Sequence, residues 1–129
     1  MPQFGRKSKA QLASCHPDLQ KLFNEAIKHY DCTVIEGHRS NADQLKAFNA
    51  GKSRIKSGGK HNQSPSLAAD VAPWPIDWKD KDRFYHFAGT VQGIAKMLNI
   101  KIRWGGDWDC DNDLKDQTLY DLPHFELID

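Results

Sequence analysis

Two pairs of residues in this chain have the types and spacing needed for a metal-dependent hydrolytic site. His61 stands nine residues before Asp70, and Asp121 stands three residues before His124. Imidazoles and carboxylates are the usual protein ligands of zinc in hydrolytic sites, where three such ligands leave one position for water. Two imidazoles and one carboxylate would complete this set, and the second carboxylate would remain to accept and return a proton.

Each pair is weak evidence when it is taken alone. The chain contains six histidines, and a single histidine is more often a surface or packed residue than a metal ligand. The HExxH helix motif is absent from the sequence, which excludes the most common arrangement of a zinc peptidase. His29, His38 and His86 are expected to be surface or packed residues outside the site.

The hydrophobic pattern predicts the elements that must bring these pairs together. Helical spacing of apolar residues predicts three helices, which are 17–29, about 82–98 and the stretch from a cap at Ser40 or Asn41 to Gly51. Ser8 is expected to cap a brief helical turn that runs to Ala13. Runs of β-branched and apolar residues predict four strands, which are 33–36, 67–72, 100–104 and 125–128.

These elements indicate an α+β fold, with two or three helices and a small, mostly antiparallel sheet in a single domain of residues 1–129. His61 precedes the strand that contains Asp70, and His124 begins the last strand. Side chains on neighbouring antiparallel strands can converge on one face of a sheet. The Gly-, Ser- and Lys-rich segment 51–66 is expected to be a long loop.

The composition restricts the class of protein. The chain has 39% hydrophobic residues, 27% charged residues and a net charge of +1. This composition is ordinary for a globular protein, and the small net charge gives no reason to expect nucleic acid or a membrane as partner. A monomer is expected. Met1–Ala10 is polar and basic with no apolar stretch behind it, so no signal peptide is predicted. The three cysteines show no CxxC spacing, and Cys15 and Cys32 are expected to be reduced core residues.

The acidic segment from Asp107 to Asp116 is a candidate for a second metal site. Its alternating carboxylates resemble the start of a calcium-binding loop, but the glycine at the sixth position and the closing glutamate are absent. Binding of calcium and a solvated acidic loop without an ion are both open interpretations of this segment.

Several motifs occur in a fixed order along the chain, and they are His16-Pro-Asp-Leu, Gly37-His-Arg-Ser followed by Gln44, His61 followed by Asp70-Val-Ala-Pro, Trp104-Gly-Gly-Asp-Trp, and Asp121-Leu-Pro-His124. Together they resemble the zinc peptidase family of D-Ala-D-Ala carboxypeptidases and L-alanyl-D-glutamate endopeptidases, and most closely the phage endolysins of the L-alanyl-D-glutamate type. The resemblance covers most of the chain. The sequence departs from the family pattern in a longer step from His61 to Asp70 and in Gly59, where the family often has serine.

The resemblance implies that His61, Asp70 and His124 bind zinc. It also implies that Asp121 is the catalytic acid and base. The zinc would lower the pKa of a bound water molecule to about 7 and polarise the scissile carbonyl.

The resemblance further implies that Arg39, supported by Gln44, contacts a substrate carboxylate or the transition state. Glu36 is a candidate to orient Arg39, and an ordinary strand residue is an equally good interpretation. The implied activity is hydrolysis of the peptidoglycan stem peptide at the L-Ala–D-Glu bond, by a phage-type endolysin that is made in the host cytoplasm and acts on the cell wall after release. The alternatives are a D-Ala-D-Ala carboxypeptidase and a non-catalytic, zinc-containing domain that binds cell-wall peptide.

Overall fold

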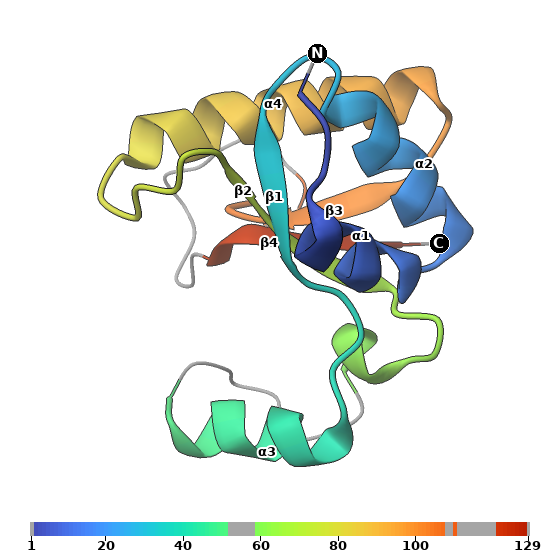
Figure 1. The fold of residues 1–129 in the computed structure, drawn as a ribbon, viewed down its shortest axis with the longest axis vertical. Coiled ribbons are helices and arrows are strands. Elements are labelled where there is room, and N and C mark those ends of the chain that lie inside the picture. The colour runs from blue at the N-terminus through green and yellow to red at the C-terminus, as the bar shows by residue number, and fades with distance from the viewer. Residues whose placement is uncertain (1, 52–58, 108–109, 111–120, 129) are drawn as a thin grey trace.

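A four-stranded antiparallel sheet in the order β1-β2-β4-β3 forms the centre of the molecule (Figure 1). The computed structural model describes residues 2–51, 59–107, 110 and 121–128. The helices and the strands are α1 (Arg6–Ala13), α2 (Pro17–Ala26), β1 (Cys32–Glu36), α3 (Asn41–Asn49), the 3₁₀ helix η1 (Lys60–Asn62), β2 (Ala68–Pro73), α4 (Lys81–Met97), β3 (Ile102–Gly105) and β4 (Asp121–Leu127).

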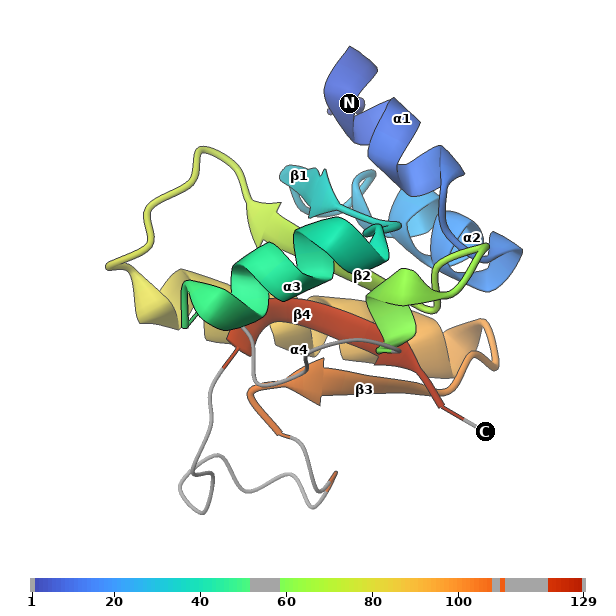
Figure 2. The same ribbon diagram turned by 90° about the horizontal axis from the view of Figure 1, so that it is seen from below.

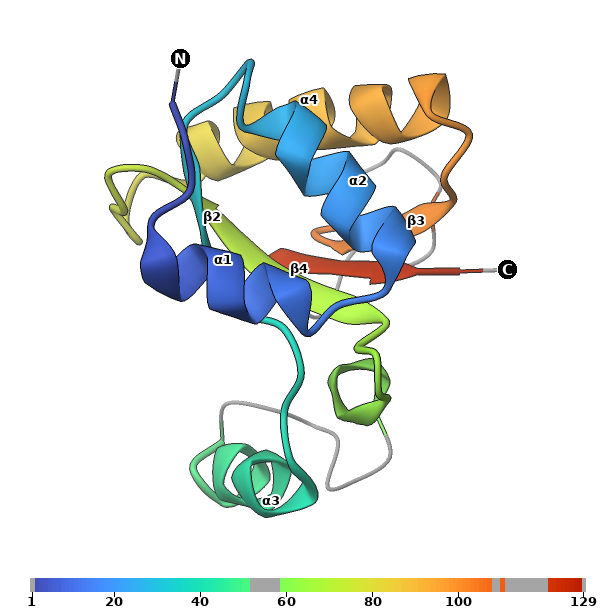
Figure 3. The ribbon, with the colours of Figure 1, turned by 45° about the vertical axis from the view of Figure 1, so that its right-hand side comes forward.

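The helices divide between the two faces of the sheet. Helices α2 and α4 cover one face, whereas α3 and η1 lie on the other side (Figures 1 and 3). Helix α1 packs beside the edge strand β1, and α3 stands in front of β2 and β4 when the molecule is seen from below (Figure 2). The sheet therefore has a helix-covered face, called the core face, and an opposite face, called the site face.

Local sequence signals explain where α2 begins and how it packs. Pro17 occupies the first helical position, where its missing N–H costs nothing, and the His16 ring accepts a hydrogen bond from the backbone N–H of Asp18 at 3.0 Å. The apolar positions of this helix face inward, so that Leu22 and Phe23 are fully buried.

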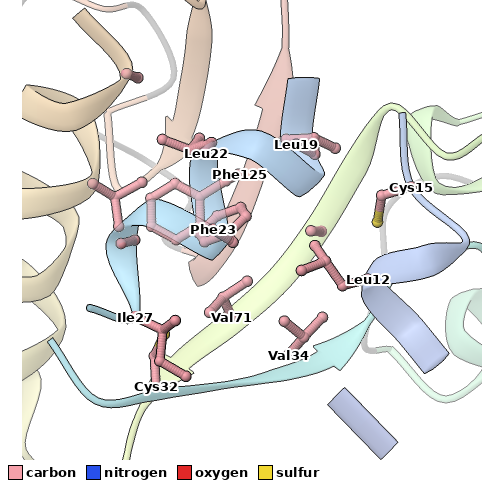
Figure 4. Close-up of a cluster of buried hydrophobic side chains, with 14 of the residues drawn as sticks. Leu12, Cys15, Leu19, Leu22, Phe23, Ile27, Cys32, Val34, Val71 and Phe125 are labelled. Atoms are coloured by element: carbon pink, nitrogen blue, oxygen red, sulfur yellow. The ribbon is translucent and has the colours of Figure 1, made fainter. Parts of the chain in front are cut away.

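The core lies between α2, α4 and the sheet (Figure 4). Phe125 of β4 is fully buried, and its ring meets Phe23 and Phe87 edge-on, with centroids 5.5 and 6.0 Å apart. Val34 of β1 and Val71 of β2 point to the same side (Figure 4). Complete burial of a side chain of this size stabilises the fold by about 1.5–3 kcal/mol.

The α+β class and the antiparallel sheet are confirmed, with one helix more than expected. Arg6–Ala13 is a helix of eight residues rather than a brief turn. Ser8 lies inside this helix and does not cap it. Its hydroxyl instead accepts a hydrogen bond from the backbone N–H of Val34 at 3.1 Å and contacts the Thr33 hydroxyl. Helix α2 ends three residues earlier than predicted, since a turn follows Ala26.

The last strand begins four residues earlier than predicted, at Asp121, so His124 lies inside β4 rather than at its start. Part of the expected long loop, Lys60–Asn62, forms η1, whereas residues 52–58 lie outside the described residues. Within the part of the chain that the structure describes, no helix has the length and apolar character needed to cross a membrane.

The cysteines agree with the expectation of reduced thiols. Cys15 and Cys32 are buried in the core and none of the three cysteines forms a disulfide. Burial raises the pKa of the Cys15 thiol to about 11 and that of the Cys32 thiol to about 12, so both thiols are protonated at neutral pH.

Candidate metal centre

His61, Asp70 and His124 meet on the site face of the sheet. Nε2 of His61 lies 3.2 Å from Oδ1 of Asp70, and Nδ1 of His124 lies 3.3 Å from the same oxygen. One ligand atom from each residue lies within 4.8 Å of the others. Among the described residues this is the one group of histidine, cysteine and acidic side chains that could hold a metal ion.

Strand alternation explains why two of these residues face each other. Asp70 of β2 is the direct partner of His124 of β4, and Ala69 is the partner of Phe125. Because successive side chains point to opposite faces, the pair Ala69 and Phe125 enters the core while Asp70 and His124 point to the site face. His61 is supplied by η1, just before β2.

Each imidazole is held by a second contact on its far side. Nδ1 of His61 lies 2.7 Å from the carbonyl oxygen of Gly37, and Nε2 of His124 lies 2.8 Å from Oε1 of Glu126. These contacts turn Nε2 of His61 and Nδ1 of His124 toward Asp70. Hydrogen bonds of this kind orient histidine ligands around metal ions.

Helix α1 holds the backbone that supplies the acceptor for His61. Gln11 accepts a hydrogen bond from the Gly37 N–H at 3.0 Å, and the Ser14 hydroxyl accepts one from the His38 N–H at 2.8 Å. A Cβ atom on Gly37 would meet the Gln11 carbonyl oxygen and the Cys15 sulfur. Only glycine therefore allows this close approach between α1 and the strand end.

The electrostatics of the group favour positive charge between its members. Burial by itself would raise the pKa of Asp70, but hydrogen bonds and charges from His124 and His61 hold that pKa well below its usual value. Burial disfavours the charged form of His124, yet hydrogen bonds to Asp70 and Glu126 raise its pKa to about 9. Positive charge at this point is what a metal ion supplies.

The donor set and its two imidazole–carboxylate distances fit a tetrahedral metal ion. Two ligand atoms that each lie about 2.1 Å from a tetrahedral ion are about 3.4 Å apart. The two imidazole–carboxylate distances, 3.2 and 3.3 Å, are close to this value. Two imidazoles and one carboxylate also leave a coordination position for water or substrate, as in hydrolytic zinc sites.

Asp121 lies next to this group because β4 carries a bulge. In a regular strand, residues three apart would face opposite sides, but the register passes from Trp104↔Phe125 directly to Gly105↔Asp121. The indole N–H of Trp104 donates to the Leu122 carbonyl at 2.7 Å and fixes the extra residues. Oδ2 of Asp121 consequently lies 4.0 Å from Nδ1 of His124.

The environment of Asp121 suits a group that exchanges protons. Its side chain is 44% exposed, so solvent and substrate can reach it. Burial, and then the negative charge of Asp70, raise the pKa of Asp121 above its usual value. A carboxylate with a raised pKa holds a transferred proton more readily, which is what a general acid and base requires.

Arg39 borders the same group and is tightly held. Its Nε and Nη2 donate to the two Glu36 carboxylate oxygens at 2.9 and 2.7 Å, and its Nη1 donates to Gln44 Oε1 at 2.9 Å. Its Nη2 also lies 3.7 Å from Oδ2 of Asp70. Hydrogen bonding to Glu36 raises the pKa of Arg39 further, so the guanidinium keeps its charge. Of the two open interpretations of Glu36, the contact with Arg39 is the one that the structure supports.

Some contacts around the site have no clear signal in the sequence. Glu126 could have been found from its position two residues after His124, since such residues share a strand face. The Gly37 carbonyl could not, because a backbone acceptor leaves no mark in residue type. Of the acidic segment considered as a candidate for calcium, residues 108–109 and 111–116 lie outside the described residues. His29, His38 and His86 are exposed and are not among the converging ligand residues, as expected.

Comparisons with known proteins match the chain over almost its entire length. Residues 1–128 match the family model described as phage L-alanyl-D-glutamate peptidase. The chain is 34% identical over 134 aligned residues to the L-alanyl-D-glutamate peptidase of Escherichia phage T5, and the alignment covers 98% of each protein. The crystal structure of Serratia marcescens L-Ala D-Glu endopeptidase ChiX superposes with a TM-score of 0.78 at 30% identity, covering 98% of this chain and 90% of that one.

Proposed function

The chain belongs to the phage L-alanyl-D-glutamate peptidase family, and we propose that it is a zinc peptidase that cuts the L-Ala–D-Glu bond of peptidoglycan stem peptides in host cell lysis. The observation that carries the proposal is the convergence of His61, Asp70 and His124, with the Asp121 carboxylate 4.0 Å from one of them. The three converging residues would hold the zinc ion.

The metal and the chain's own residues have separate tasks in this proposal. When bound, zinc would supply a Lewis acid that lowers the pKa of water to about 7 and polarises the scissile carbonyl. Asp121 then takes a proton from the attacking water on its carboxylate and passes it to the leaving amine. Its half-exposed side chain lets it reach both groups, and its raised pKa lets it keep the proton between the two steps.

Arg39 is proposed to contact the substrate at its D-Glu carboxylate or at the oxygen that becomes negative during the reaction. Guanidinium groups bind carboxylates with high geometric specificity. Glu36 and Gln44 occupy three of its N–H groups, so its remaining N–H groups act from a fixed position. Gln44, which is 2% exposed, supports the arginine rather than the substrate.

Mass spectrometry of purified peptidoglycan after digestion tests the proposal. Fragments with a new N-terminal D-Glu are expected. Release of free D-alanine alone would indicate a carboxypeptidase, and an unchanged wall with retained zinc would indicate a non-catalytic binding domain. Metal analysis of His124→Ala, beside the exposed control His38→Ala, should show loss of zinc in the first variant only.

A further inference from the structure

Glu126 occupies a buried position between His124 and Arg103. Its Oε1 lies 2.8 Å from Nε2 of His124, and its Oε2 accepts a hydrogen bond from Nη2 of Arg103 at 2.8 Å. Glu126 is 5% exposed and His124 is 8% exposed, whereas the Arg103 side chain is 36% exposed. The two oxygens of one buried carboxylate thus connect a candidate metal ligand to a surface guanidinium.

The sheet register produces this arrangement. Arg103 of β3 is the direct partner of Glu126 of β4, and His124 lies two residues earlier on the same strand. All three side chains therefore point to the site face. A carboxylate held from both sides by strands of one sheet has little freedom to rotate, and it can fix the ring that it contacts.

The two imidazoles differ in the kind of acceptor that holds them. The His61 ring meets a neutral backbone carbonyl, but the His124 ring meets a carboxylate. A carboxylate accepts a stronger hydrogen bond than a neutral oxygen does. It favours a ring hydrogen on Nε2, so that Nδ1, which faces Asp70, is the nitrogen available to a metal ion.

We propose that Glu126, itself held by Arg103, is a positioning residue that makes His124 bind the metal through Nδ1 and strengthens that bond. The inference rests on the proposed function for the presence of zinc at this group. It deepens that function by assigning the residues that decide which nitrogen of His124 is used. Loss of a carboxylate of this kind typically weakens metal binding about 10- to 100-fold.

A purely structural role is the competing explanation, since Arg103 and Glu126 form a cross-strand ion pair. Such a role predicts a loss of folding stability with unchanged zinc affinity. Zinc affinity, measured by competition with a chromogenic chelator, separates the two explanations because it does not depend on catalysis. Melting temperatures of the same samples report stability.

The experiment compares Glu126→Ala with Glu126→Gln in the full chain. The alanine variant is expected to bind zinc about 10- to 100-fold more weakly. The glutamine variant, whose amide oxygen can still accept from Nε2, should recover most of this loss. Long-range ¹H–¹⁵N spectra of the zinc-loaded protein should show zinc on Nδ1 of His124 in the wild type and in the glutamine variant. The control Glu25→Ala removes a half-exposed surface carboxylate paired with Lys28, and should leave zinc affinity unchanged.

Arg103→Met provides a second test that stands even where Glu126→Ala does not fold. Arg103→Met by itself should weaken zinc binding measurably, but by less than the loss of about 10- to 100-fold expected for Glu126→Ala, and unchanged zinc affinity would overturn the proposal. Where Glu126→Ala folds, adding Arg103→Met to it should have no further effect. Zinc affinity of Glu126→Ala within about twofold of wild type, against the 10- to 100-fold loss expected, overturns the proposal. A spectrum that shows zinc bound to Nε2 of His124 also overturns the proposal. Wild-type protein that binds zinc but leaves the L-Ala–D-Glu bond intact refutes the proposed function alone.

Discussion

Replacement of Asp121 by asparagine gives the sharpest test of the division of roles at this site. The change keeps the size of the side chain but removes its charge and its capacity to take a proton. Asp121 lies outside the three residues whose ligand atoms converge, at 4.0 Å from Nδ1 of His124. Zinc content should therefore stay at the wild-type level while hydrolysis fails.

The magnitudes of the two effects differ enough to be separated. Because the Asp121 side chain is 44% exposed, its ionic contacts contribute about 0.2–1 kcal/mol to folding stability. Loss of a general acid and base lowers the rate about 10²- to 10⁴-fold, which is about 3–5 kcal/mol in activation free energy. The activation barrier should thus change several times more than the free energy of unfolding.

The assay measures kcat and KM on a synthetic stem peptide, with zinc content and melting temperature determined on the same preparation. Asp18→Asn, an exposed acid in the first turn of α2, is the matched control and should behave as wild type. A zinc-loaded Asp121→Asn variant whose kcat stays within about threefold of wild type, far from the expected loss, would refute the assignment. Loss of zinc instead would make Asp121 a metal ligand.

Three further changes test other parts of the structure. Gly105→Ala should lower kcat more than about tenfold, because the new Cβ would overlap the Asp121 carbonyl. The control is Gly93→Ala on α4, where the new Cβ meets open space. This variant should keep kcat and gain up to about 1 kcal/mol of stability in urea titration. Arg39→Ala should destabilise the fold by about 1–3 kcal/mol as well as reduce activity, since the side chain is 12% exposed and donates three hydrogen bonds to Glu36 and Gln44. An unchanged urea midpoint would contradict this. At pH 8, a thiol reagent should modify the exposed Cys110 rapidly and the buried Cys15 and Cys32 only after unfolding. Burial raises the pKa of both buried thiols and keeps them protonated, and the protonated thiol is the unreactive form. Rapid labelling of all three cysteines would show that the core opens.

The sequence predicted the elements well wherever one face of an element is apolar. The predicted helix at 82–98 differs from α4 by one residue at each end, because helical spacing of apolar residues directly reports burial. The start of β4 was missed because Pro123 argues against a strand. The bulge explains how a proline is accommodated there, since the extra residues opposite Gly105 leave the regular ladder.

The sequence indicated which side chains would converge, but it indicated only some of the contacts that hold them. His61, Asp70, Asp121 and His124 were expected together, and the structure brings them together. Arg39 was expected with Gln44 as its support and with Glu36 as a candidate to orient it, and the structure shows both contacts. The Gly37 carbonyl and the contacts of Gln11 and Ser14 that hold it were not expected. They depend on close backbone approach, which residue types along one chain do not reveal.

The pairing of β4 with β2 has a consequence for how the protein folds. A slip of one residue between these strands would exchange the two faces of β4. His124 would then enter the hydrophobic core, and Phe125 would be exposed at the metal site. Because burial of Phe125 against Phe23 and Phe87 is worth about 1.5–3 kcal/mol, the slipped pairing is disfavoured. The burial of an aromatic ring in the core therefore selects the strand alignment that places His124 beside Asp70 on the site face.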